Sequence, residues 1–200
     1  MRYRAGKHTS AARSVLEHLA AGPLPEWPAF AAGVQVRSVA AGETLFRSDV
    51  PWPWLCVVQR GLFKLVYLRA DGGERIKSFI GETGFFASLS GLAPGGRTSF
   101  AAVAVQPGVV ELLSYPRILE LGERHLAWQK ALRAGLQHYG ERKEKREREL
   151  LMLSPEQRYC LFLQEEPALA ARIAQQDIAL YLGITPVALS RIRGRMQRAR

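Results

Sequence analysis

The pattern of hydrophobic and polar positions changes character near Tyr115. Before that point, short apolar runs alternate with turn residues, as they do in chains of short antiparallel strands. The predicted strands are Val34–Val39, Leu55–Gln59, Leu62–Arg69, Glu74–Ile80, Ser99–Val105 and Val109–Ser114. Strands of this length and spacing predict a jelly roll or barrel rather than a βαβ fold.

Turn residues separate these runs. Ala70-Asp71-Gly72-Gly73 predicts a hairpin, because Asp and Gly tolerate a positive φ. Ala40-Ala41-Gly42-Glu43, Arg60-Gly61 and Gln106-Pro107-Gly108 predict further turns. A short helix is predicted ahead of the strands, near Ala11–Ala21.

After Tyr115 the pattern is helical. Pro116 can begin a short helix, and a longer one is predicted from His125 to Leu153. Its residues Trp128, Leu132, Gly135 and Tyr139 are spaced four, three and four apart, which is typical of a coiled-coil seam. We therefore expect this helix to be the dimer contact, with a monomer that packs the helix internally as the alternative.

The C-terminal segment predicts further helices. Ser154-Pro155-Glu156 is a helix start, and Glu165-Glu166-Pro167 ends that helix. From Arg172 to Arg200 the sequence predicts a helix-turn-helix motif. Gly183 stands where a helix end favours a left-handed residue, while Thr185 can cap the second helix and Pro186 suits its first turn.

The second helix of this motif has two distinct faces. Leu189, Ile192 and Met196 share the face predicted to be buried. Val187, Arg191, Gly194 and Arg198 point away from it, Ser190 and Arg195 flank that stripe, and Arg193 lies nearer the buried edge. Since no acid follows Asp177, the face suits a polyanion. The predicted DNA-binding residues are Thr185, Val187, Ser190, Arg191, Arg193, Arg195 and Arg198. The alternative is an ordinary helical hairpin with a solvated basic end.

Composition narrows the class of partner. The 200 residues carry a net charge of +10 and a pI near 10.1, which favours nucleic acid or an anionic membrane surface. Cys56 and Cys160 are too few for an iron–sulfur or four-thiolate zinc site, and we expect reduced thiols in a cytoplasmic protein, with a disulfide as the alternative. We expect no metal site, no secretory signal and no membrane span.

These observations predict an α+β chain in four parts. Residues 1–27 form a helical lead-in, residues 28–116 a β-roll sensor domain, residues 117–153 a connecting and dimerisation helix, and residues 154–200 a helix-turn-helix DNA-binding domain. Two reading helices presented by a dimer would lie about 34 Å apart and would select a palindromic site.

Four segments resemble the Crp/Fnr family of bacterial transcription regulators. They are LCVVQRGLFKLVYLRADGGERIKSFI (55–80), GETGFFASLSGLAPGGRTSFAAVAV (81–105), VVELLSYPRI (109–118) and the helix-turn-helix IALYLGITPVALSRIR. The resemblance implies a jelly-roll domain like those that bind cyclic nucleotides, a homodimer along the central helix and promoter binding, with RNA polymerase as a further partner. Arg191 matches the family arginine that contacts guanine, and Val187 and Ser190 match other positions that face the groove.

The resemblance is incomplete at the phosphate-binding cassette. Arg97-Thr98 matches the pair that holds the cyclic phosphate, but Ala87-Ser88 replaces the Gly-Glu that grips the ribose hydroxyl. We name Ala87, Ser88, Arg97 and Thr98 as candidate effector residues, yet Ser88 argues against a cyclic nucleotide. A different effector and a loop without a ligand both stay open, and no cofactor is implied. The β-hairpin wing of many members does not follow the second helix, and we expect the terminal arginines to substitute for it.

The sequence favours a dimeric, sequence-specific DNA-binding transcription regulator, controlled by a small effector in the β-roll. The alternative is a ligand-binding module that acts through a protein partner without binding DNA. An enzyme is disfavoured, since we find no paired carboxylates in a plausible cleft, no Ser/His/Asp set, no Walker loop and no metal cluster.

Overall fold

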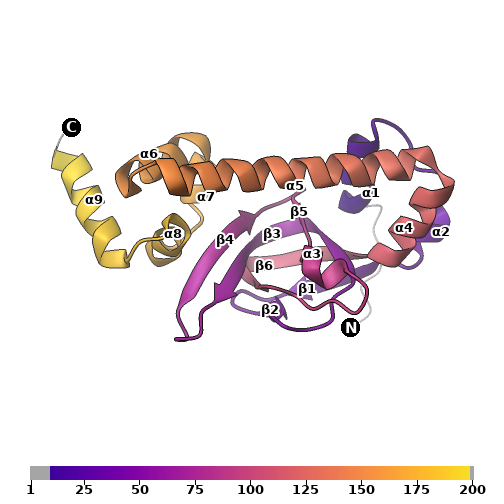
Figure 1. Ribbon diagram of the computed structural model, residues 1–200, viewed down its shortest axis with the longest axis horizontal. Helices are drawn as coiled ribbons and strands as arrows, with labels where there is room; N and C mark the ends of the chain where they lie inside the picture. The colour runs from indigo at the N-terminus through magenta and orange to yellow at the C-terminus, as the bar shows by residue number, and fades with distance from the viewer. Residues whose placement is uncertain (1–9, 199–200) are drawn as a thin grey trace.

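A β-roll, one long helix above it and a helical C-terminal unit make up the chain (Figure 1). The computed structural model describes residues 10–198. The described strands are β1 (Gln35–Val39), β2 (Thr44–Phe46), β3 (Trp54–Leu68), β4 (Glu74–Ile80), β5 (Phe85–Phe86) and β6 (Ala101–Ser114). The helices are α1 (Ala11–Ala20), α2 (Trp27–Ala31), α3 (Leu89–Leu92), α4 (Tyr115–Arg124), α5 (Leu126–Met152), α6 (Pro155–Glu165), α7 (Pro167–Ala170), α8 (Gln175–Leu182) and α9 (Pro186–Arg198).

The described strands pair antiparallel, which confirms the predicted roll. The sheet order is β1-β6-β3-β4, with β2 paired to β6 and β5 paired to β3. The hairpin predicted at Asp71-Gly72 joins β3 to β4, and Gly72 has a φ of 78° there. The prediction missed β2 and β5, which have three and two residues and are too short to leave a periodic signal.

Two predicted turns are wrong. Arg60-Gly61 and Gln106-Pro107-Gly108 lie inside the long strands β3 and β6, where the pairing register shifts between Val58 and Phe63. Gly61 has a φ of 97°, and a Cβ built there would meet the Cα of Gly108 at 2.6 Å. The turn residues therefore mark β-bulges that face each other across the β3–β6 ladder. The two predicted strands on either side of each bulge are one continuous strand, β3 in the first case and β6 in the second.

The central strand β3 is buried on both faces, and three apolar clusters result. The first fills the roll and includes Phe63, Phe86, Phe100 and Leu112. The second lies under α1, α2, α4 and α5 and includes Trp27, Phe30 and Trp128. The third joins the outer side of β3 and β4 to the C-terminal helices; its members include Leu62, Val66, Ile76, Phe79, Phe162, Ile178 and Leu189.

The predicted helices are observed close to their expected bounds. Ser10 caps α1 by accepting from Arg13 N, and the buried carboxylate of Glu111 on β6 accepts from Ser10 Oγ at 2.5 Å and Ala11 N at 2.9 Å. A capping box formed by Ser154 and Gln157 begins α6. The short helices α2, α3 and α7 were not predicted.

Ion pairs join the helix-turn-helix unit to the outer side of the roll. Lys64 Nζ on β3 lies 2.9 Å from Asp177 Oδ1 on α8. The guanidinium of Arg172 lies 2.9 Å and 3.0 Å from the two carboxylate oxygens of Glu82, and it also donates to Gln106 Oε1 in the β6 bulge. Glu82 Oε1 in turn accepts from Gly61 N in the β3 bulge. The two bulges therefore support the residues that hold Arg172.

We expect Gly61→Ala to lower the free energy of unfolding by more than about 2 kcal/mol, because the added Cβ meets backbone atoms at a positive φ. Gly72→Ala is the matched control. Its φ is 78° and no atom lies within 4 Å of the added Cβ, so only the backbone term of about 1 kcal/mol applies. Urea unfolding of both variants measures the difference, and equal losses would contradict the facing-bulge arrangement.

We expect the Glu82–Arg172 pair to couple by about 0.5–1 kcal/mol at neutral pH, since both side chains are partly exposed. The hydrogen bonds from Arg172 lower the pKa of Glu82 from 4.5 to about 2. A lowered carboxyl pKa stabilises the fold above pH 4.5, and this contribution declines as the pH falls towards 2. A double-mutant cycle with Glu82→Gln and Arg172→Gln, measured by urea unfolding between pH 7 and pH 3, tests the coupling. A coupling that grows on acidification would contradict the assignment.

Candidate nucleic-acid interface

A tight glycine turn joins α8 to α9. Gly183 ends α8 in the left-handed region, with a φ of 76°. Thr185 Oγ1 accepts a hydrogen bond from Ala188 N at 3.2 Å, and Pro186 is the first residue of α9. The local signals predicted for this turn are confirmed, and they fix the direction in which α9 leaves α8.

One face of α9 is buried against the rest of the unit. Leu189 and Ile192 are buried, and Met196 packs partly against the same cluster. They meet Ile178 and Leu182 from α8, which are also buried. The apolar spacing predicted from the sequence therefore identifies the packed side of α9 correctly, and the opposite side is left free.

The free side of α9 carries the predicted reading residues. Val187 is 61% exposed, and Ser190, Arg191 and Arg198 are exposed as well. Arg193 is half-buried, in agreement with its predicted place near the packed edge. α9 itself contains no acidic residue. This face thus combines two exposed guanidinium groups with a small polar and an apolar side chain, which suits both base edges and phosphates.

One predicted DNA-binding residue, Arg195, forms an ion pair within the chain. Arg195 Nη2 lies 3.0 Å from Glu156 Oε2 on α6, so Arg195 ties the two helices together. Both side chains are about half-exposed, and such pairs are weak. Arg195 can therefore exchange this carboxylate for a phosphate at little cost.

Helix α9 lies at the far end of the molecule from the roll. In Figure 1, α9 is the outermost element on the left, and α8 lies between it and the β4 edge. The apolar contacts of α8 with Phe79 on β4 hold the motif in this position. Nothing among the described contacts joins the exposed side of α9 to the roll.

The predicted dimer seam needs a correction. Trp128 is 0% exposed, because its ring stacks on Trp27 and its Nε1 donates to Pro25 O at 2.9 Å within the same chain. Gly135 faces Leu19 and Phe85, and Tyr139 Oη lies 3.4 Å from Lys77 Nζ. These three positions face the chain's own helices and roll, which excludes Trp128 from any direct contact with a second copy.

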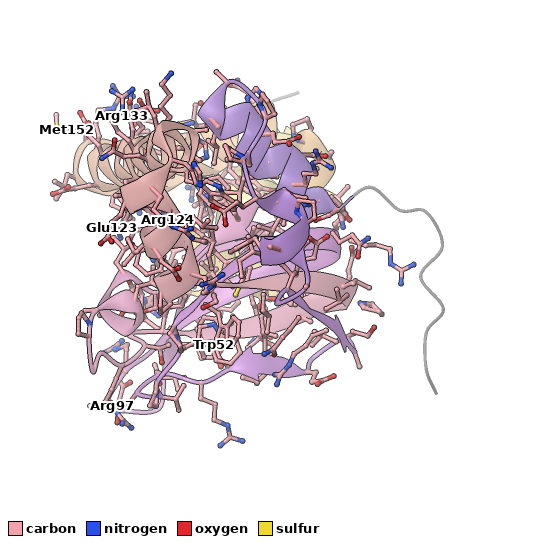
Figure 2. The ribbon with its side chains drawn as sticks, turned by 90° about the vertical axis from the view of Figure 1, so that its right-hand side faces the viewer. Trp52, Arg97, Glu123, Arg124, Arg133 and Met152 are labelled. Atoms are coloured by element: carbon pink, nitrogen blue, oxygen red, sulfur yellow. The ribbon has the colours of Figure 1, made fainter. Side chains whose placement is uncertain are left out.

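A different strip of α5 faces outward. Leu126 is 65% exposed and Leu136 is 49% exposed. With Gln129 and Arg133 they are spaced three, four and three apart, and Leu132, the remaining predicted seam residue, lines the same shallow groove. Arg133 lies on the outer side of the long helix in Figure 2. This strip has the heptad spacing predicted for a seam, but in a different rotational phase.

The four predicted effector residues do not line one common binding site. Ser88 is completely buried, and its Oγ accepts from Ser99 N at 3.0 Å. Thr98 is buried and bonded to the backbone of Arg47 and Val50. Arg97, at the outer edge of the roll in Figure 2, is 54% exposed, and its Nε lies 2.7 Å from Asp49 Oδ1. Only Ala87 lines the cavity between the roll and α5. Ser88 and Thr98 thus stabilise the backbone around them, while Arg97 forms an ion pair with Asp49 outside the cavity.

The cavity between the roll and α5 was not predicted. It has a volume of about 350 Å³, and its walls come from β3, β4, β5, α5 and α8. The sequence signal was present in Lys77, a cation in the middle of a predicted strand, but Tyr139 on α5, whose Oη contacts Lys77 Nζ, lies 62 residues further along the chain.

Residues 10–198 contain neither a metal cluster nor a membrane-spanning helix. This part of the chain brings no three histidine, cysteine or acidic side chains together as a metal site would. Within it, no helix combines the length and the apolar character that a membrane crossing requires. Cys56 is buried in the roll, where desolvation raises its pKa to about 12.

Comparison with known proteins agrees with this geometry. Residues 36–125 match the model of the cyclic nucleotide-binding domain family. FixK2 from Bradyrhizobium japonicum is 22% identical with a TM-score of 0.70, over 83% of this chain and 85% of that one. A CooA mutant from Carboxydothermus hydrogenoformans is 12% identical with a TM-score of 0.72, over 98% and 87%.

A third solved structure has the same fold. The CLP protein of Xanthomonas campestris is called a c-di-GMP responsive global regulator; it is 19% identical with a TM-score of 0.68, over 85% of this chain and 89% of that one. Among curated proteins, no sequence matches this chain. Residues 36–125 therefore form a domain of the cyclic nucleotide-binding family, and the chain as a whole has the fold of the Crp/Fnr transcription regulators, as its motifs predicted.

Proposed function

We propose that this protein is a dimeric, sequence-specific DNA-binding transcription regulator. The observation that carries the proposal is the exposed, acid-free side of α9, which is held at the end of the molecule by a capped glycine turn. A helix presented in this way can enter the major groove, and the net charge of +10 favours the approach to DNA.

Roles within α9 follow from the exposure of its side chains. Arg191 is the residue for direct base readout, since its guanidinium fork fits the two acceptors of guanine. Val187 supplies an apolar contact, for which a thymine methyl is a suitable partner, and Ser190 a short polar one. We assign Arg195 and Arg198 to phosphate contacts. Thr185 caps the start of α9, and Arg193 lies nearer its packed edge.

Dimerisation would use the outward strip of α5 defined by Leu126, Gln129, Arg133 and Leu136. Two large leucines exposed at heptad spacing on a 27-residue helix are typical of a surface that is covered in the functional state. Such a dimer presents two copies of α9 and selects a site with twofold symmetry.

A regulatory module that acts through a protein partner is the competing function. It would keep the roll and its cavity but would use the C-terminal helices for docking on a protein. Val187 is the one large apolar side chain exposed on the described part of α9, and several arginines surround it. Such a surface suits DNA better than a protein partner.

We expect Arg191→Ala to relax base preference at one position of the site and to cost about 1–3 kcal/mol in binding. Gel shifts at fixed salt, after selection of bound sequences from a random pool, measure both effects. Arg47→Ala is the matched control, since it removes one exposed positive charge from the roll and should alter affinity only slightly. If the parent protein prefers no sequence over random DNA, the protein-partner module is favoured instead.

We expect Leu136→Glu to convert the dimer to a monomer, because two like charges would face each other across the seam. Sedimentation velocity over a concentration series measures the change. Leu119→Glu on α4, where the leucine is 42% exposed, is the control and should leave the dimer intact. A parent protein that sediments as a monomer at all concentrations would contradict the proposed seam.

A further inference from the structure

The C-terminal ends of α5 and α8 lie side by side, at the junction between the long helix and the helix-turn-helix unit. A Cβ built at Gly183, which ends α8, would lie 3.8 Å from Leu150 Cδ2 on the last turn of α5. The link from α5 to α6 consists of two residues, Leu153 and Ser154. The last carbonyls of a helix have no partner within it, so each helix end carries partial negative charge. Two such ends at one place need cations between them.

Arg158 of α6 bridges the two helix ends. Its Nη1 donates to Leu153 O at 2.7 Å and to Leu150 O at 3.4 Å, both at the end of α5. Its Nε donates to Leu182 O, the last carbonyl of α8, at 3.2 Å. One guanidinium therefore joins the end of the long helix to the end of the first helix of the helix-turn-helix motif.

Arg146 of α5 holds the neighbouring carbonyl of α8. It donates to Tyr181 O, and its guanidinium lies 4.0 Å from the centre of the Tyr181 ring. Glu149 on the same helix balances its charge at 3.3 Å. The Tyr181 ring also packs against Phe79 of β4 and Phe162 of α6, with ring centres 5.5 Å apart in both cases. The last two carbonyls of α8 are thus both held by arginines of other helices.

These two arginines differ from the apolar cluster in the kind of restraint that they provide. The cluster with Phe79 and Phe162 holds α8 against the roll, but apolar contacts have no preferred direction. A guanidinium has a rigid fork of donors, and the carbonyls of a helix end point along the helix axis. Contacts of this kind restrain the angle between α5 and α8 as well as their distance.

That angle determines where α9 lies relative to the dimer axis. The outward strip of α5 is the proposed dimer contact, and α8 continues through Gly183 into α9. The 13 residues of α9 make a helix about 20 Å long. A rotation of about 10° at the junction would move its far end by about 3.4 Å, the rise of one base pair. A small loss of angular restraint is therefore enough to change the spacing between two copies of α9.

We propose that Arg158, together with Arg146, is a positioning residue that sets the spacing of the half-sites recognised by the dimer. The assignment gives Arg158 no contact with a base or a phosphate, since its effect passes through α8 and the glycine turn into α9. This inference rests on the proposed function, because it requires a dimer bound to DNA.

Three duplexes test the assignment. They are the palindromic site selected from a random pool, the same site with one base pair inserted between its halves, and a single half-site. Fluorescence anisotropy at fixed salt gives the Kd of the full-length protein for each duplex. The parent should bind the inserted site at least about tenfold more weakly than the selected site, because its two α9 helices cannot engage both halves together.

Arg158→Met should bind the selected and inserted sites within about threefold of each other, because a loose junction reaches either spacing but is less preorganised for both. Binding to the single half-site should stay within about twofold of the parent, since the exposed residues of α9 are unchanged. Arg158→Lys keeps a cation at the two helix ends without the fork, so it should lose the same discrimination with a thermal midpoint closer to that of the parent.

Arg148→Met is the matched control. Arg148 is exposed on α5 and belongs to none of the ion pairs among residues 10–198. The substitution removes the same charge from the same region, and it should discriminate between the two spacings as the parent does.

Several results would overturn the proposal. They are parental discrimination in a folded Arg158→Met protein, an equal loss of discrimination in Arg148→Met, and a loss of half-site binding as large as the loss at the full site. Failure of both Arg158 variants to fold would assign Arg158 to the fold instead of to the spacing. A parent that prefers no sequence contradicts the regulator function itself, and gel shifts with the parent alone detect that failure.

Discussion

The burial of the outer side of β3 and β4 against the C-terminal helices is the interaction on which the rest of the arrangement depends. Leu62, Val66, Ile76 and Phe79 leave the roll on that side and enter one cluster with Phe162, Ile178 and Leu189. A sheet whose two faces are both apolar must cover the second face, and the helix-turn-helix motif does so with α8. α8 is thereby fixed to the roll, and α9, packed on α8, has its exposed side turned outward. Side chains of β3, β4, α6 and α8 thus determine where the exposed arginines of α9 lie.

The fold and the local structure of the helix-turn-helix motif could be predicted from the sequence, because both rest on short-range signals. Gly183, Thr185 and Pro186 act within a few residues, and the Leu189–Ile192 spacing identifies the packed side of α9 without reference to the rest of the chain. The seam on α5 shows the limit of such reasoning. The heptad period was present, but an apolar residue can be buried against any apolar surface. Trp128 packs against Trp27 and Phe30 of its own chain. Periodicity indicates that a helix has apolar stripes, and only tertiary structure indicates which stripe remains uncovered.

The bulges show a second limit. Glycine and proline separate strands in most chains, and Arg60-Gly61 and Gln106-Pro107-Gly108 were read in that way. The same residues are needed where two long strands deform together, since Gly61 and Gly108 approach too closely for a side chain. Local sequence does not distinguish the two cases, because the difference lies in whether the strand continues to pair with its neighbour. The bulges also support an ion pair. Gly61 N donates a hydrogen bond to Glu82, and the side chain of Gln106 accepts one from Arg172.

The charges around α8 divide into two unlike groups. On one side, Lys64 with Asp177 and Arg172 with Glu82 are complete pairs that hold the motif to the roll. On the other side, Lys77 and Arg142 line one cavity, and Arg142 is among the charges that lower the pKa of Lys77. The ion pairs and the apolar cluster, rather than the cations of the cavity, therefore hold the motif to the roll. Because both pairs lie on the side of α8 that faces the sheet, the helix can be fixed there while α9 keeps its arginines exposed.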